Sequence, residues 1–200
     1  MLGKLKSQVQ ASIDAKQSIL QDEALLQQIV LAAKTIIQAY RNGKKTLFAG
    51  NGGSAADAQH LAGELVARFY FDRPGLPSIA LTTDSSIVTA IGNDYGYERL
   101  FARQVQAMGS EGDIFIGLST SGNSPNILSA LDTCKEKGIF SIGLTGSTGG
   151  KMADKCDICI KVPSNNTPRI QESHILIGHF LCFAIEEELF SDMKPVKSQK

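Results

Sequence analysis

The sequence predicts an α/β domain built on a five-stranded parallel sheet with helices on both faces. Five short runs rich in β-branched and apolar residues alternate with segments whose apolar residues recur at helical spacing. Such alternation is typical of parallel βαβ units. The 200 residues are 42% hydrophobic, enough for one core, and show no linker, low-complexity tract or internal repeat. We therefore expect a single domain over residues 1–200.

A pair of helices is expected first, over about residues 4–42. Apolar residues recur at helical spacing in QVQASIDAKQSIL and in ALLQQIVLAAKTIIQAY, and RNG ends the second stretch. The apolar stripe of this pair is too generous for an isolated hairpin to bury. The pair therefore packs either on another subunit or over its own sheet, and the sequence leaves both possibilities open.

The α/β core is expected over about 43–190, followed by a short C-terminal tail. Its strands are expected at 45–49, 78–82, 113–118, 139–144 and 157–162. Its helices are expected at 54–69, 97–108, 124–137, a short one near 149–154, and 168–190. Ligands of open parallel sheets bind beyond the carboxyl ends of the strands, so function is expected just after residues 50, 82, 118, 144 and 162.

Charge and cysteine usage argue against several classes of protein. Lys+Arg and Asp+Glu each number 20, so nothing favours binding to nucleic acid or to an anionic membrane. No apolar segment suits a signal peptide or reaches the ~20 residues that span a bilayer, and we expect a cytoplasmic protein with reduced cysteines. Cys156 and Cys159 form a CxxC, but they lie in the strand-like DICIKV without a second pair, which favours a core role over zinc binding.

The segment STSGNSPN, which follows the third expected strand, is a candidate phosphate loop. It combines a glycine, the start of a helix with Pro125 in its first turn, and the hydroxyls of Ser119, Thr120, Ser121 and Ser124. The free N–H groups of a helix N-terminus suit a phosphate. The alternative is that Ser124 merely caps the helix after an ordinary turn. A nucleoside triphosphate site is not favoured, because the segment has no GK[ST] ending.

The segment AGNGGSAADAQH is a second glycine-rich loop, after the first expected strand. Ser54 is expected to be the N-cap of the following helix, with Asp57 at the spacing of a capping box. The segment does not match GxGxxG, so dinucleotide binding is a poor fit. LTGSTGG, at 144–150, offers a third such turn.

Two helices carry residues suited to acid–base or metal chemistry. His60 and Glu64 are four residues apart and share one helical face. Gln171 and His179 lie about 80° apart around the last helix and can converge on one site. The alternatives are an ordinary surface pair for the first two and a satisfied core histidine for His179.

Together, GNGGSAADAQH with Glu64, LTTDSS…AIGNDYG, STSGNSPN and RIQESHIL with His179 resemble the sedoheptulose 7-phosphate isomerases (phosphoheptose isomerases) of the SIS sugar-isomerase family, over about residues 20–190. The resemblance implies a flavodoxin-like three-layer sandwich and a homotetramer with active sites at subunit interfaces. It implies conversion of sedoheptulose 7-phosphate to D-glycero-D-manno-heptose 7-phosphate, the first committed step towards ADP-heptose and the lipopolysaccharide core.

The resemblance also implies roles for individual residues. One zinc ion per subunit would be bound by His60, Glu64, Gln171 and His179. Glu64 and His179 would be the acid–base pair. The phosphate would be bound by Ser119, Thr120, Ser121 and Ser124. The sugar would contact Asn51, Gly52, Gly53, Asn93 and Asp94, with Glu64 and Gln171 shared between substrate and metal.

Two other functions remain open at this point. A regulator of the same fold, which binds the replication initiator, has a C-terminal helix similar to LCFAIEEELF, but such regulators lack the counterparts of Glu64 and His179. The third possibility is an isomerase of another phosphosugar, against which the HxxxE and QxxxxxxxH pairs argue. One departure from the family is SNNTPRIQE, which lacks the acidic group that some relatives carry before RIQE.

Overall fold

The computed structural model describes residues 1–194, and its core is a five-stranded sheet in which every neighbouring pair is parallel. The strands are β1 (Thr46–Gly50), β2 (Ser78–Ala80), β3 (Ile114–Leu118), β4 (Phe140–Thr145) and β5 (Ile158–Lys161). Their order across the sheet, β2-β1-β3-β4-β5, is that of flavodoxin-like folds. All five expected strands are confirmed to within two residues at each end.

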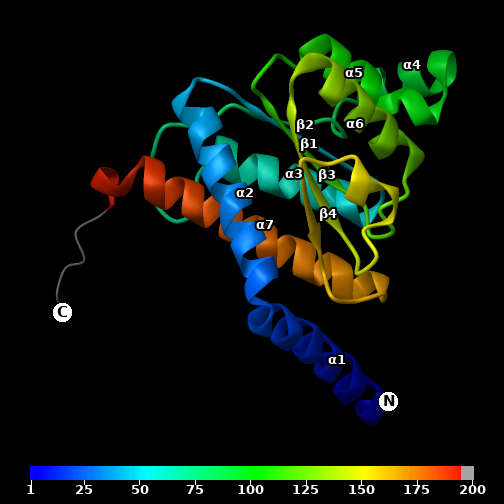
Figure 1. Cartoon of the computed structure of the whole chain (residues 1–200), viewed down its shortest axis with the longest axis vertical. Coiled ribbons are helices and arrows are strands. Elements are labelled where there is room, and N and C mark those ends of the chain that lie inside the picture. The colour runs from blue at the N-terminus through cyan, green and yellow to red at the C-terminus, as the bar shows by residue number, and fades with distance from the viewer. Residues whose placement is uncertain (195–200) are drawn as a thin grey trace.

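Helices cover both faces of the sheet (Figure 1). They are α1 (Leu2–Gln21), α2 (Glu23–Arg41), α3 (Gly53–Val66), α4 (Ser85–Tyr95), α5 (Leu100–Met108), α6 (Pro125–Lys137) and α7 (Thr167–Leu189), with the short 3₁₀ turns η1 (Tyr97–Arg99), η2 (Gly150–Asp154) and η3 (Ser191–Met193). Alternate residues of a strand point to opposite faces. Phe48 accordingly packs in the core under α2, α3 and α7, whereas Leu47 and Phe115 pack under α5 and α6. The three-layer prediction is confirmed.

The two helices of the N-terminal pair pack differently, and packing on another subunit stays a prediction. Helix α2 packs over its own sheet and buries Ile29, Ala32 and Ile36. Helix α1 instead extends away from the body of the molecule (Figure 1), and its Leu5 and Val9 are exposed.

Helix α4 is the element that the sequence analysis missed. Its segment SSIVTAIGNDY contains β-branched residues and a glycine, which are weak helix formers, and it buries no residue. The helix begins because the Asp84 carboxylate accepts a hydrogen bond from the backbone N–H of Ile87 at 2.9 Å. Its position matters because it carries Asn93 and Asp94.

None of the helices within residues 1–194 combines the length and apolar character that crossing a bilayer requires. The cysteines are free, with Cys134 and Cys182 buried and Cys156 and Cys159 half-buried. Of the expected C-terminal tail, residues 195–200 lie outside the described part of the chain.

Candidate active site

The glycine loop, residues 51–53, connects β1 to α3 by a backbone path that side chains would block. A Cβ atom on Gly50 would lie 2.4 Å from the carbonyl oxygen of Ser54, and Gly52 has a φ of +56°. The expectation that Ser54 is the N-cap of α3 is wrong. The N-cap is instead Gly52, and Ser54 is the second residue of α3 and is buried. Helix α3 therefore begins without a side-chain cap, and the N–H groups of Ser54 and Ala55 donate to the backbone carbonyls of Asn51 and Gly52.

The segment STSGNSPN after β3, here called the hydroxyl loop, brings three serine side chains together. The buried Ser119 places its Oγ 2.8 Å from the Oγ of Ser124 and 3.5 Å from that of Ser121. Ser124 is the N-cap residue of α6, yet its side chain makes no capping hydrogen bond, and Pro125 is the first helical residue as expected. Capping alone therefore does not explain this serine cluster, and the arrangement favours an anion at the start of α6.

The third glycine-rich turn supports this loop from behind. Gly122 has a φ of +64°, and a Cβ there would lie 2.0 Å from the carbonyl oxygen of Gly149. The carbonyl of the half-buried Thr120 accepts a hydrogen bond from the N–H of Gly146 at 3.1 Å. The turn at 144–150 thus fixes the path of the hydroxyl loop.

Asn126 and Tyr97, which the sequence analysis did not select, both form hydrogen bonds with Asn51 of the glycine loop. The side-chain amides of Asn51 and Asn126 exchange hydrogen bonds of 2.9 and 2.8 Å, and Asn126 is only 2% exposed. The Tyr97 hydroxyl donates to Oδ1 of Asn51 at 3.0 Å. Asn126 lies in the quoted STSGNSPN motif, but its partner is 75 residues away and only the packed sheet brings the two together.

His60, Glu64 and His179 converge, although they come from α3 and α7. The Nε2 atoms of the two histidines are 2.9 Å apart, and Oε1 of Glu64 is 3.3 Å from Nε2 of His60. Close approach of the helices is possible because position 178 is a glycine, whose Cβ would lie 2.5 Å from Cδ1 of Leu61. His179 is therefore not the core histidine that the alternative reading expected. The core histidine of this helix is His174, which is completely buried.

The donor atoms of these three residues suit a metal ion. They lie within 4.8 Å of one another, which can accommodate a tetrahedral ion with bonds of about 2.0–2.2 Å. Two imidazole nitrogens at 2.9 Å require a proton or a cation between them, because two lone pairs repel.

Asp57, expected in a capping box, instead has a buried Oδ2 without a hydrogen-bond partner. Burial raises the pKa of Asp57, while the charges of His60 and His179 oppose that rise. A cation near the rings of His60 and His179 would favour the ionised form of this carboxyl.

Gln171 lies at the glycine loop. A Cβ on Gly53 would lie 2.7 Å from Nε2 of Gln171, so the amide covers the start of α3. Eight residues of helix separate Gln171 from His179, about 12 Å along the axis of α7. The contact supports a role at the ligand end of the loop, and its role as a metal ligand stays a prediction.

Asn93 and Asp94 lie at the end of α4 and are exposed. Nδ2 of Asn93 donates to Oδ1 of Asp94 at 2.8 Å. Within residues 1–194, neither side chain is hydrogen-bonded to another candidate residue. Their predicted contact with the sugar therefore stays a prediction.

The chain as a whole is similar to known proteins of one family. A family model described as SIS domain matches residues 11–146. A phosphoheptose isomerase of Aneurinibacillus thermoaerophilus is 68% identical over 93% of this chain and 94% of its own length, and phosphoheptose isomerase 2 of Campylobacter jejuni is 67% identical over 93% and 92%. The solved structure of a phosphoheptose isomerase from Francisella tularensis is 42% identical, with a TM-score of 0.89, over 93% of this chain and 98% of that one. A phosphoheptose isomerase from Neisseria gonorrhoeae has the same identity and coverage, with a TM-score of 0.87.

Proposed function

The chain belongs to the SIS domain family, and we propose that it is a phosphoheptose isomerase that converts sedoheptulose 7-phosphate to D-glycero-D-manno-heptose 7-phosphate. The observation that carries the proposal is the meeting of a carboxylate, Glu64, and an imidazole, His179, from two separate helices. Relatives at 67–68% identity that bear this activity in their names support it. The reaction would supply the first step towards ADP-heptose and the lipopolysaccharide core.

The proposed reaction is an aldose–ketose isomerisation through an enediol(ate). Moving the carbonyl from C2 to C1 requires removal of a proton from C1 and return of a proton to C2. We assign the first step to the Glu64 carboxylate and the shuttling of protons among the oxygens to His179. The hydroxyl loop, with Ser119, Thr120, Ser121 and Ser124, would bind the phosphate, and binding there positions the distant reacting carbons.

The other end of the substrate would lie against the glycine loop. Asn51, Gly52 and Gly53 form that loop, and Gln171 covers its last glycine. Asn93 and Asp94 would complete the sugar contacts. The hydrogen bonds between Asn51 and Asn126 support this assignment, because they hold the sugar-binding and phosphate-binding loops at a fixed separation.

We also propose that His60, Glu64, Gln171 and His179 bind one zinc ion per subunit. The nitrogen and oxygen donors suit zinc, and three of the four side chains already converge. A cation bound there would stabilise negative charge on the enediolate oxygen. Because Glu64 is both proposed ligand and proposed base, its two roles compete for the same carboxylate.

The assembly that we propose is a cytoplasmic homotetramer with active sites at subunit interfaces. The exposed apolar side chains on α1 and α7 support it, because they offer surface for another copy to bury. They are Leu2, Leu5, Val9, Ile13, Leu176 and Phe180. The regulator that binds the replication initiator is not favoured, since the residues that such regulators lack, Glu64 and His179, are present and converge.

An assay of purified protein with sedoheptulose 7-phosphate tests the proposal. The wild type should form the aldose, and Glu64→Gln should lower kcat by about 10²–10⁴-fold while the fold and oligomer persist. Glu136→Gln, at an exposed position of α6, serves as the control and should retain full activity. A wild type that is inert with this substrate, but isomerises a pentose phosphate or binds an initiator protein, would disprove the proposal.

A further inference from the structure

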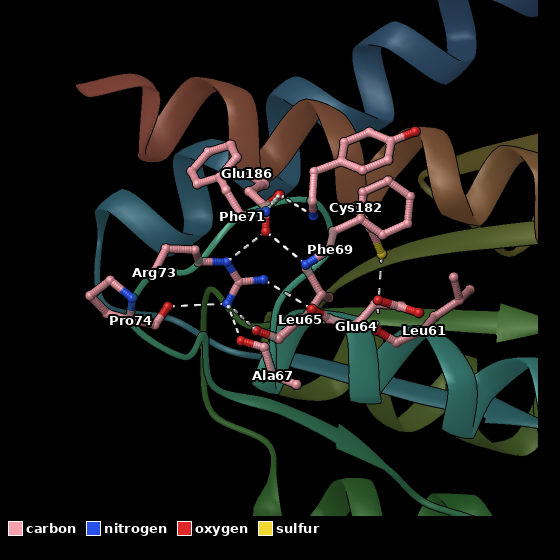
Figure 2. Close-up of polar contacts among 11 residues, drawn as sticks. Leu61, Glu64, Leu65, Ala67, Phe69, Phe71, Arg73, Pro74, Cys182 and Glu186 are labelled. Atoms are coloured by element: carbon pink, nitrogen blue, oxygen red, sulfur yellow. Dashed lines mark hydrogen bonds and ion pairs between the residues drawn. The ribbon is translucent and has the colours of Figure 1, made fainter. Parts of the chain in front are cut away.

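A buried ion pair between Arg73 and Glu186 links the two helices of the candidate site (Figure 2). The Nε of Arg73 donates to Oε2 of Glu186 at 3.1 Å, and the side chains are 0% and 1% exposed. Glu186 belongs to α7 and lies seven residues after His179, so both lie on nearly the same face of that helix. Arg73 belongs to the segment that follows α3.

The guanidinium group of Arg73 terminates α3. The last carbonyls of a helix have no partners within it. Nη2 of Arg73 donates to the carbonyl of Glu64 at 2.9 Å, and Nη1 donates to the carbonyl of Leu65 at 2.6 Å. A cation at this end also complements the helix dipole. The backbone of Glu64, the proposed base, is therefore held directly by Arg73 (Figure 2).

The carboxylate of Glu186 holds the segment after α3. Its Oε2 accepts the N–H of Phe69 at 2.8 Å, and its Oε1 accepts the N–H of Tyr70 at 2.6 Å. The ring of Phe69 contacts the ring of His179, with centroids 5.6 Å apart. The same pair of side chains thus fixes the backbone of Glu64 and a neighbour of His179.

We infer that Arg73 and Glu186 are positioning residues, which set the distance between the Glu64 carboxylate and the His179 ring. The inference rests on the proposed function and deepens it. The Glu64 side chain is 25% exposed, with its nearest polar partner 3.3 Å away, so its place depends mainly on the backbone that carries it. A displacement of about 1 Å between reacting groups can cost 10²-fold in rate.

Arginine is required at position 73 because its donors must reach in several directions. A lysine can keep the charge next to Glu186, but its single nitrogen cannot also reach both carbonyls at the end of α3. Arg73→Lys therefore separates the terminating role from the ion pair. We expect it to fold, to lower kcat by about 10- to 100-fold, and to leave KM within about twofold, because the hydroxyl loop is untouched.

The chain contains a matched control in the pair of Lys45 and Asp113. Like Glu186, the buried Asp113 carboxylate pairs with a cation, the Lys45 ammonium group at 2.6 Å, and accepts hydrogen bonds from two backbone N–H groups. This pair lies at the amino ends of β1 and β3, away from the site. Asp113→Asn and Glu186→Gln make the same chemical change. Both should lower the unfolding temperature, but only Glu186→Gln should lower kcat per folded molecule.

A second measurement does not depend on turnover. The chain has three histidines, so the ring resonances of metal-free protein can be followed individually by NMR. Arg73→Lys should shift the resonances of His60 and His179 and leave His174 unchanged, and Asp113→Asn should shift none of them. If the wild type does not isomerise sedoheptulose 7-phosphate, the proposed function fails and these resonances alone decide the positioning role.

Two outcomes would overturn the inference. The first is an Arg73→Lys protein with wild-type kcat and unshifted resonances of His60 and His179. The second is an Asp113→Asn protein that loses kcat and shifts those resonances as much as Glu186→Gln, since the effect would then be general destabilisation. If Glu186→Gln does not fold, Arg73→Lys decides by itself.

Discussion

The Nε2 atoms of His60 and His179 lie 2.9 Å apart, although 119 residues separate them in the chain. Glu64 adds an oxygen 3.3 Å from the first of these nitrogens. The three side chains form a compact set of donors at the meeting of α3 and α7. Four predictions follow from this cluster and from the packing around it.

Removing a proposed ligand should weaken zinc binding. We expect chelator-treated wild type to take up about one zinc per subunit. His60→Gln should bind zinc at least about 100-fold more weakly, because it removes a proposed ligand. Losing only a residue that hydrogen-bonds to a ligand typically lowers metal affinity by 10–100-fold. Calorimetric titration with zinc measures both. Gln59→Ala, which changes the exposed neighbour, is the control. If Gln171→Ala binds zinc as the wild type does, Gln171 is not a ligand.

Loss of a hydroxyl in the serine cluster should weaken phosphate binding more than it slows chemistry. Ser124→Ala removes a hydroxyl that lies 2.8 Å from Ser119, without removing a cap bond. A hydrogen bond to a charged group contributes about 1.5–3 kcal/mol, so KM should rise by about 10- to 100-fold with a smaller change in kcat. Ser129→Ala on the same helix is the control. Steady-state kinetics that show an unchanged KM would exclude Ser124 from the phosphate site.

Two glycine-to-alanine substitutions within α3 should differ in their effect on activity. Gly53→Ala places a methyl group 2.7 Å from Nε2 of Gln171, which must rotate away, so activity should fall while the fold persists. Gly63→Ala meets no atom within 4 Å and should stabilise the protein by about 0.5–1 kcal/mol without loss of activity. Thermal unfolding and kinetics on both variants provide the comparison. Full activity in Gly53→Ala would remove Gln171 from the site.

Stability should fall below pH 6.5 because of His174. Burial lowers the pKa of His174 from 6.5 to about 4, and the hydrogen bond to the Thr145 carbonyl only partly opposes this. The folded protein keeps the ring neutral, whereas the unfolded chain takes up a proton below pH 6.5. Stability from this group is thus present above pH 6.5 and is lost as the pH falls towards 4, by about 3 kcal/mol in total.

Urea unfolding of the wild type and of His174→Gln between pH 7 and pH 4 checks this prediction. The variant should show a flatter pH dependence, because glutamine can still donate to the Thr145 carbonyl but does not titrate. An equally steep loss of stability in the variant would assign the acid sensitivity to other groups.

The elements of the fold were predictable where local pattern and burial agree. All five strands are apolar because helices cover both of their faces, and the helices of the core bury regular stripes. Helix α4 was missed because it buries nothing, so no stripe marks it. The N-cap of α3 was misplaced because a capping side chain was expected, whereas the helix begins after Gly52 without one.

The candidate site was predictable in its residue types but not in its connections. The motif around Ser119 and the pair of His60 and Glu64 can be read along the chain. The bonds between Asn51 and Asn126, and between Arg73 and Glu186, cannot, because each joins residues more than 70 positions apart. No local spacing distinguishes Arg73 from an exposed arginine.

The sequence by itself determined the order of the strands and of the helices other than α4, the hydroxyl-rich loop suited to an anion, and the helices that carry His60, Glu64 and His179. Local propensity, hydrophobic period and turn chemistry are sufficient for these features. Only the tertiary structure decided that α3 and α7 pack closely at Gly178, so that an imidazole from each meets the Glu64 carboxylate. That meeting depends on contacts between distant segments, and their geometry is set by the packing of the whole core.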